Sequence, residues 1–120
     1  MSWIAVGALG CAAAIAAGAF GAHGLRARLD AEALALWETA ARYLMYGSLG
    51  LLAIGLYERF STAGGAGWAA PILAVGVMIF SLTVGALALG GPRWLGAVTP
   101  LGGLLMIVGF VLFAWSSWRS

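Results

Sequence analysis

Long runs of apolar residues divide the chain into four segments, and charged side chains mark the ends of these segments. No charge precedes Arg26, and the next uncharged intervals lie between Arg42 and Glu58, then Arg59 and Arg93, then Arg93 and Arg119. Since a bilayer-spanning helix needs about 20 mostly apolar residues, these intervals predict spans at residues 3–22, 43–57, 71–90 and 100–118. The runs are continuous rather than alternating, which favours helices over a membrane barrel. We therefore expect an all-α integral membrane protein, a single four-transmembrane-helix bundle with short loops over residues 1–120.

Small and turn-forming residues separate the predicted spans. Residues 61–67 form a Gly-rich turn after the second span, and Pro71 suits the first turn of the third. Residues 90–92, Gly-Gly-Pro, end that span. Thr99 reads as an N-cap with Pro100 at the first helical position. We therefore expect residues 92–98 to form a short connector at the membrane interface.

The second span begins as an extended, partly amphipathic helix. Asp30 can cap it, and Glu32 lies in its first turn, near the positive end of the helix dipole. Apolar residues at a spacing of three or four follow, and Glu38 and Arg42 are an i,i+4 pair in the favourable order. These signals predict one long helix from Asp30 to about residue 60, with its first third outside the hydrocarbon. The alternative is an interfacial helix, a bend and a separate span.

The composition agrees with a membrane protein and excludes several other classes. Hydrophobic residues make up 63% of the 120 residues and charged residues only 8%, against roughly 25% charged in a typical soluble domain. That balance excludes an ordinary globular enzyme, a nucleic-acid-binding module and a disordered chain. The single Cys11 excludes an internal disulfide framework. The first apolar run lacks a basic flank, so we predict a retained span rather than a cleaved leader.

Arginine positions give a topology. With four spans, both termini lie on one side of the membrane. Four arginines lie on the side of the first and third loops (Arg26, Arg28, Arg42 and Arg93), and two lie on the terminal side (Arg59 and Arg119). The positive-inside rule then places loops one and three in the cytoplasm and the termini outside. Arg26 and Arg28 can also hold anionic lipid.

Small residues recur at helix-packing intervals. In the first span Gly10, Ala14, Gly18 and Ala22 repeat every four residues, and Gly21 adds a second row. In the fourth span Gly102 and Gly109 lie one heptad apart. Such faces let a neighbouring helix approach closely. They serve either packing within the bundle or contact with another subunit.

Reactive side chains are few. One histidine and one cysteine cannot supply a pair of haem ligands or a Cys/His zinc site, and no phosphate-binding Gly-rich loop is present. No Ser–His–acid set is identifiable, and no ionisable side chain lies at mid-span, which argues against an ion-coupled pump. We expect no catalytic residues, no metal and no cofactor. His23 is either an interfacial histidine bonded to loop groups or a proton-responsive or ligand-contacting group.

Four motifs carry a family resemblance that covers almost the whole chain. They are GAFGAHGL at residues 18–25, WETA at 37–40 followed by Tyr43, Met45 and Tyr46, Phe-Ser at 80–81, and LGAVTPLGG at 95–103. The chain resembles the domain of unknown function 423 family, small bacterial inner-membrane proteins related to the animal transmembrane protein 256. The resemblance implies a four-helix membrane protein with no established activity. The chain departs from the family pattern at three positions. Family members often carry a histidine where this chain has Gly47, some carry another at the position of Leu44, and a tyrosine is common at that of Gly85.

The predicted topology brings these motifs to one membrane face. Five polar and aromatic residues form the candidate cluster there: His23, Trp37, Tyr43, Arg93 and Thr99. We expect His23 to form a hydrogen bond with a polar group of another segment on that side.

Three functions remain open. The first is an accessory or assembly subunit that packs against other membrane proteins. The second is a homo-oligomeric facilitator or lipid-binding protein, with a cavity lined by Ser48, Ser81, Thr83 or Thr99. The third is an interfacial enzyme that uses His23, which the missing chemistry disfavours. The expected partners are membrane lipids and either other integral membrane subunits or a second copy of the chain, with no nucleic acid.

Overall fold

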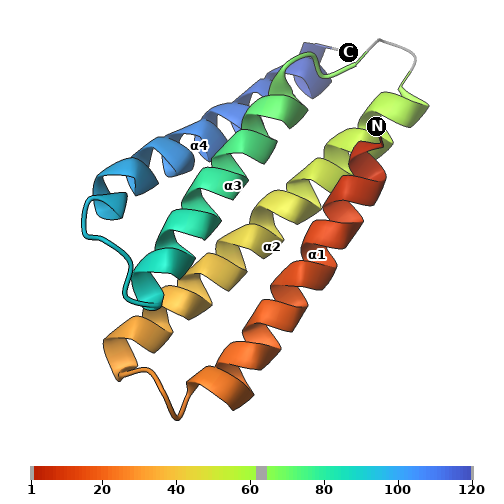
Figure 1. Ribbon diagram of the computed structural model, residues 1–120. Coiled ribbons are helices and arrows are strands. Elements are labelled where there is room, and N and C mark those ends of the chain that lie inside the picture. The colour runs from red at the N-terminus through yellow and green to blue at the C-terminus, as the bar shows by residue number, and fades with distance from the viewer. Residues whose placement is uncertain (1, 62–64, 120) are drawn as a thin grey trace.

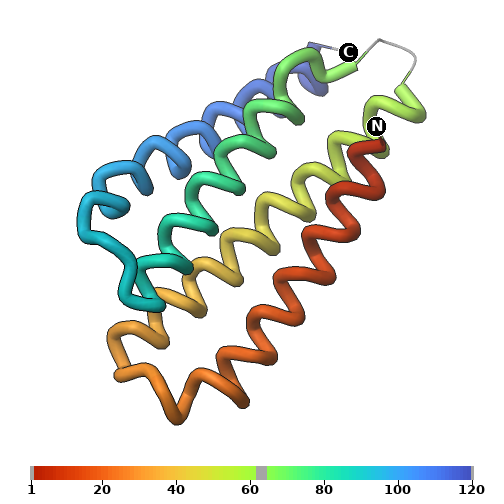
Figure 2. The backbone as a smooth tube through the Cα atoms, viewed as in Figure 1, coloured from red at the N-terminus to blue at the C-terminus, as the bar shows by residue number. Residues whose placement is uncertain are grey.

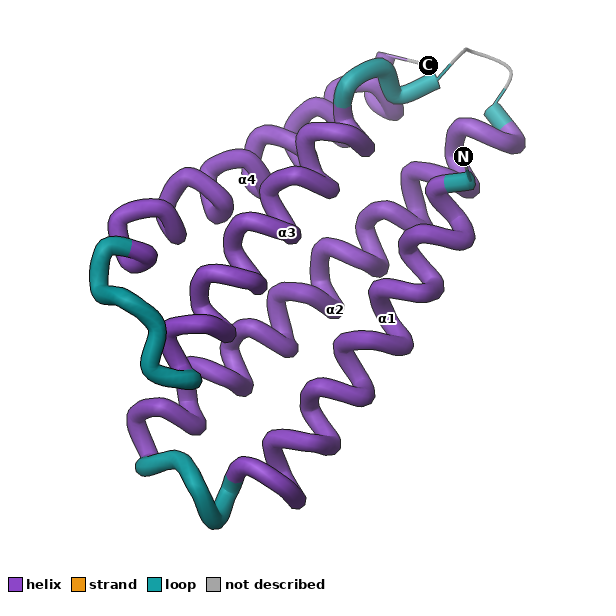
Figure 3. Tube along the Cα trace, viewed as in Figure 1, coloured by secondary structure: helices purple, strands orange, loops and turns teal. Residues whose placement is uncertain are grey.

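The computed structural model describes residues 2–61 and 65–119, and these ranges are helical, with short turns and no strand (Figure 3). A π-helix, η1, continues the first helix directly. The elements are α1 Trp3–Phe20, η1 Gly21–Leu25, α2 Ala31–Phe60, α3 Ala69–Ala88 and α4 Leu95–Arg119 (Figure 1). The predicted all-α class is confirmed. The predicted turn at residues 61–67 falls partly on residues 62–64, which lie outside the described residues.

Each helix runs antiparallel to the one before it, and α2 lies between α1 and α3 (Figure 2). Helix α4 packs along α3 and meets α2 near the terminal end, where the Tyr57 hydroxyl donates to the Ser116 carbonyl oxygen at 3.1 Å. Both termini lie at this end, and the loops after η1 and after α3 lie at the other. Helix α1 therefore has one principal neighbour, α2, and much of its surface stays uncovered.

The apolar core lies between α2, α3 and α4. Ile54 of α2 and Leu73 of α3 are 0% exposed, and Met106 of α4 is 5% exposed. Val77 and Leu51 complete the contact between α2 and α3. Burial of such side chains keeps these three helices together, while α1 contributes mainly small residues to its interface with α2.

Three segments are long and apolar enough to cross a membrane: residues 3–25, Ala69–Ala88 and Leu95–Arg119. Helix α2 is not among them. Its charged residues explain this, because only 15 residues lie between Arg42 and Glu58. The second predicted span, residues 43–57, therefore remains a proposal.

The single long helix predicted from Asp30 is confirmed. The Asp30 carboxylate accepts a hydrogen bond from the Ala33 N–H at 2.8 Å, and α2 continues without a break to Phe60. The predicted Glu38–Arg42 ion pair is absent from the described residues, since Arg42 Nη2 donates instead to Thr39 Oγ1 at 3.2 Å. Pro71 lies in the first turn of α3, as predicted. Helix α3 ends two residues before the predicted boundary, and Gly90 follows with φ +92°.

The predicted start of the fourth helix is wrong. Helix α4 begins at Leu95, so Thr99 and Pro100 lie inside it and Thr99 is not an N-cap. Thr99 Oγ1 donates to the Leu95 carbonyl at 3.0 Å. Pro100 has no N–H, so the Gly96 carbonyl loses its intrahelical donor, and the Thr99 hydroxyl bonds a different carbonyl, that of Leu95. The loss of one backbone hydrogen bond near the start of the helix does not end it. The helix therefore continues through a Thr-Pro pair that resembles a helix start.

Candidate functional site

The first family-like motif forms the junction between α1 and α2. The Trp37 indole Nε1–H donates to the Ala17 carbonyl oxygen at 2.8 Å, and the edge of Phe20 packs on the Trp37 ring with centroids 6.2 Å apart. Gly21 leaves room for this ring, because a Cβ there would lie 2.6 Å from Trp37 Cδ1. The helix widens to a π-turn at this point, a feature frequently found at functional sites.

The five residues of the candidate cluster, all of which the structure describes, do not form hydrogen bonds or ring contacts with one another. His23 and Arg93 are exposed, and their side chains form no hydrogen bond or ion pair with the described part of the chain. Tyr43 packs on Phe80 with ring centroids 4.7 Å apart. No hydrogen bond or ring contact between described residues joins any two members of the cluster. The hydrogen bond expected for His23 is therefore not formed.

Thr99 pairs with Thr83 instead. Their hydroxyl oxygens are 2.7 Å apart, and Thr83 Oγ1 also lies 2.7 Å from the Ile79 carbonyl and 3.2 Å from the Phe80 carbonyl. Both threonines therefore have hydrogen-bond partners, and they link α3 to α4. Of the four hydroxyl residues expected to line a cavity, these two are used in helix packing.

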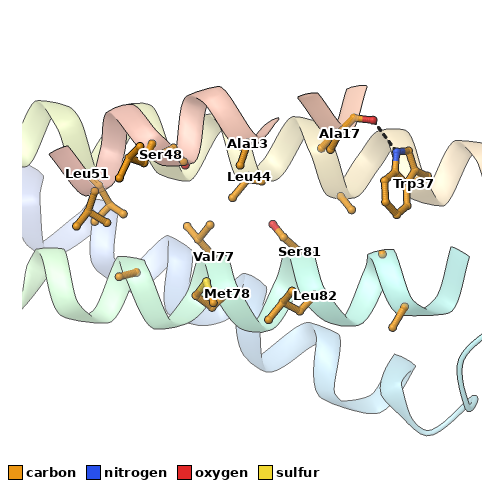
Figure 4. Close-up of a pocket in the computed structure, with 18 of the residues that line it drawn as sticks. Ala13, Ala17, Trp37, Leu44, Ser48, Leu51, Val77, Met78, Ser81 and Leu82 are labelled. Atoms are coloured by element: carbon orange, nitrogen blue, oxygen red, sulfur yellow. Dashed lines mark hydrogen bonds between the residues drawn. The ribbon is translucent and has the colours of Figure 1, made fainter. Parts of the chain in front are cut away.

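The other two, Ser48 and Ser81, lie along a groove between α1 and α3 (Figure 4). We call it the α1–α3 groove. It is bounded by residues 6–17 of α1, 37–51 of α2, 74–88 of α3 and Leu89 just after α3, and it has a volume of about 600 Å³. Its lining is almost entirely apolar. Ser48 is 2% exposed and packs under Gly10. Ser81 Oγ is shielded and has no hydrogen-bond partner in the described structure.

The predicted packing residues fall into two groups. Gly10, Ala14 and Gly21 face α2, and Gly102 and Gly109 face α3 so closely that a Cβ on either would lie under 3.0 Å from that helix's backbone. A Cβ at Gly18 would meet nothing within 4 Å, and Ala22 is exposed. The contact with α2 instead includes Gly7, where a Cβ would lie 2.5 Å from the Leu52 nitrogen. Gly7, Ala14 and Gly21 are one heptad apart, a signal that was present in the sequence.

The sequence pattern pointed to a cavity with Ser48 or Ser81 in its lining, but it gave neither the position of the α1–α3 groove nor the hydrogen bond of Trp37. Both depend on how far apart the helices lie and which faces meet, and helix periodicity alone does not fix these. No group of three or more His, Cys, Asp or Glu residues that could hold a metal ion occurs among the described residues. The arrangement offers apolar surface and helix contacts, which suit binding within the membrane.

Comparison with known proteins places these features in a family. The chain is 44% identical to a UPF0382 membrane protein of Staphylococcus saprophyticus over 92% of this chain and 91% of that protein. It is 41% identical to a UPF0382 membrane protein of Staphylococcus haemolyticus over 98% of this chain and 95% of that protein. No solved structure matches the chain. Residues 17–103 match the family described as protein of unknown function DUF423, so the chain belongs to this family, whose curated relatives are named membrane proteins.

Proposed function

We propose that this protein is an accessory or assembly subunit of the bacterial inner membrane, without enzymatic activity of its own, and that it packs against another membrane protein through the outer face of α1. The observation that carries the proposal is a row of exposed alanines on this helix. The row consists of Ala5, Ala8, Ala12, Ala16 and Ala19. Small residues let helix backbones approach closely within a membrane, where apolar area alone gives no preference for protein over lipid.

Helix α4, at the opposite edge of the molecule, exposes larger side chains. The exposed residues of α4 include Leu104, Ile107 and Val111, which are 57%, 62% and 60% exposed. Large aliphatic side chains of this sort suit contact with lipid chains. Both edge helices have only 17% of their apolar window buried inside the chain. Helix α1 also exposes Leu9 and Ile15, which are 71% and 64% exposed, but these lie on either side of the alanine row and not in it. The continuous row of small side chains therefore favours α1, rather than α4, as the face for a partner helix.

We also propose that α2 crosses the membrane as the fourth span. Its 30 residues give a length of about 45 Å at 1.5 Å per residue, more than the roughly 30 Å of bilayer hydrocarbon. It lies antiparallel between α1 and α3, both of which are long and apolar enough to span a membrane. If α1 and α3 cross the bilayer, α2 crosses it between them. The arginine bias then places loops one and three in the cytoplasm and both termini outside.

Affinity purification of variants tests the docking face. A C-terminally tagged chain is purified from its native membrane in mild detergent, alongside Ala12→Leu and the matched control Ala114→Leu, which makes the same change at an exposed position of α4. We expect a stoichiometric partner protein with the wild type and the control, and its loss with Ala12→Leu. Equal recovery in all three contradicts the docking face. A wild type that carries no other protein contradicts the accessory role.

A second candidate function is a homo-oligomeric lipid-binding protein. It is favoured by the α1–α3 groove, which opens within the apolar part of the helices and has Ser48 and Ser81 along it. A homo-oligomer that persists in the same purification, with no other protein present, supports this candidate over the accessory role.

A further inference from the structure

We propose that the α1–α3 groove holds one acyl chain of a membrane phospholipid, lying along α2. The inference deepens the lipid-binding candidate by naming the ligand and its place. It is independent of the alanine face proposed for a partner, because those alanines do not line the groove.

The chemistry of the lining selects an apolar occupant. Small residues from all three helices form much of it, among them Gly10, Ala41 and Gly85, and the exposed side chains of Leu9, Met78 and Leu82 flank them. The α1 and α3 walls belong to segments apolar enough to span a membrane. At that depth water is absent, so a hydrocarbon chain is the matching ligand.

The size of the groove favours a single chain over a helix. From Ala74 to Leu89 it follows α3 for roughly 22 Å at 1.5 Å per residue. The volume of about 600 Å³ is distributed along this length, so the groove is long and narrow. An acyl chain is narrow and flexible enough to lie within it, whereas a helix with its side chains is about 10–12 Å across.

The cytoplasmic-loop end of the groove can accept the headgroup. Leu89 and Trp37 line this end, next to the segments that carry Arg26, Arg28 and Arg93. All three arginines are exposed and have no ion pair in the described part of the chain. The acidic residues nearby are Asp30, whose carboxylate caps α2, Glu32 in the first turn, and Glu38, which is exposed next to Trp37. Arg42 follows Glu38 by one turn, so four arginines face three acidic residues at this end. Arginines close to the membrane surface attract anionic headgroups, so a phosphatidylglycerol is the preferred form of the ligand.

Gly85 offers a way to fill the groove without disturbing the helices. A Cβ there would lie 3.9 Å from Ala40 Cβ and 4.0 Å from Trp37 Cζ3, which is ordinary contact. Gly85→Leu therefore places a side chain where the acyl chain would lie. Gly18→Leu is the matched control, because Gly18 does not line the groove and has open space around it. Ala13→Leu, on the α1 side, is a second groove-filling variant.

The experiment measures lipid retained by the purified protein. Each variant is delipidated in detergent, incubated with phosphatidylglycerol or phosphatidylcholine, and examined by native mass spectrometry, with its thermal unfolding midpoint measured in parallel. We expect wild type and Gly18→Leu to retain one phospholipid, phosphatidylglycerol in preference. Gly85→Leu and Ala13→Leu should retain about tenfold less, the change that 1.4 kcal/mol of binding free energy produces, with unfolding midpoints no lower than that of the wild type.

A phosphatidylglycerol with a photoreactive group in its acyl chain then locates the chain. We expect labelling of the peptide that contains Met78 and Leu82 in the wild type and not in Gly85→Leu. Equal lipid retention by wild type and Gly85→Leu overturns the groove assignment but leaves lipid binding standing. No retained lipid in the wild type overturns both. Loss of a second copy or of another protein from Gly85→Leu, with lipid unchanged, shows instead that the groove is a protein interface.

Discussion

Trp37 links the end of α1 to α2 through one side-chain hydrogen bond and an aromatic contact. Trp37→Phe keeps the ring packed on Phe20 and removes the donor to the Ala17 carbonyl. We expect a loss of about 0.5–1.5 kcal/mol in unfolding free energy, the usual net value of one hydrogen bond. Unfolding in detergent micelles measures it, with Trp94→Phe at an exposed position as the control. Equal stability of the two variants would show that the indole hydrogen bond contributes nothing.

Two neighbouring hydroxyl residues of α3 should respond oppositely to alanine. Ser81 Oγ is shielded without a partner, while the Thr83 hydroxyl lies within hydrogen-bond distance of both the Ile79 carbonyl of its own helix and the Thr99 hydroxyl. Removing an unsatisfied polar group relieves its desolvation cost, whereas removing a paired one leaves Thr99 with one partner fewer. We expect Ser81→Ala to be neutral or stabilising and Thr83→Ala to cost about 1 kcal/mol. Destabilisation by Ser81→Ala would reveal a partner for its hydroxyl.

At the scale of helices, the sequence predicts that a helix exists better than it predicts where the helix ends and which neighbour it contacts. The lengths of the uncharged runs and the Asp30 cap were enough to predict α1, α2 and α3. These signals did not give the start of α4, because Thr-Pro reads locally as a helix start, whereas the helix begins at Leu95 and continues through Pro100 with the loss of one backbone donor. The four-residue row in α1 pointed to Gly18 and Ala22, but the contact with α2 follows Gly7, Ala14 and Gly21. The face a helix presents depends on its neighbour.

Two glycines of α4 test how closely that helix approaches α3. A Cβ at Gly109 would lie 2.9 Å from the Leu73 backbone, whereas one at Gly103 would lie 3.7 Å from the flexible ring of Phe80. We expect Gly109→Ala to destabilise the protein by about 1–3 kcal/mol through overpacking. Gly103→Ala should stabilise it by up to about 1 kcal/mol, because alanine is the better helix former. Thermal unfolding of both in one detergent gives the comparison, and a stabilised Gly109→Ala would contradict the close approach.

For the whole molecule, the candidate site was less predictable than the fold. The cluster proposed from His23, Trp37, Tyr43, Arg93 and Thr99 was inferred from their shared membrane end. Sharing an end does not bring side chains together, because each helix turns its residues toward different neighbours. The α1–α3 groove arises instead from the order of packing, in which α2 contacts both α1 and α3 and leaves a space between them. That order is a long-range property, which helix periodicity does not specify.

The parity of membrane crossings provides a test of the complete architecture. Four crossings place both termini on one side, and three place them on opposite sides, so the role of α2 decides the outcome. The termini lie at the same end of the molecule, and α2 runs the full distance between the two ends (Figure 1).

We therefore expect alkaline phosphatase fused after residue 119 to be active, and green fluorescent protein at that position to be dark, because the arginine bias places loops one and three in the cytoplasm. Reporters inserted after residue 91 should show the reverse pattern, and those fused before residue 2 should match the C-terminal result. Termini on opposite sides would mean that α2 does not cross, and its burial between α1 and α3 would then require a different arrangement of the helices in the membrane.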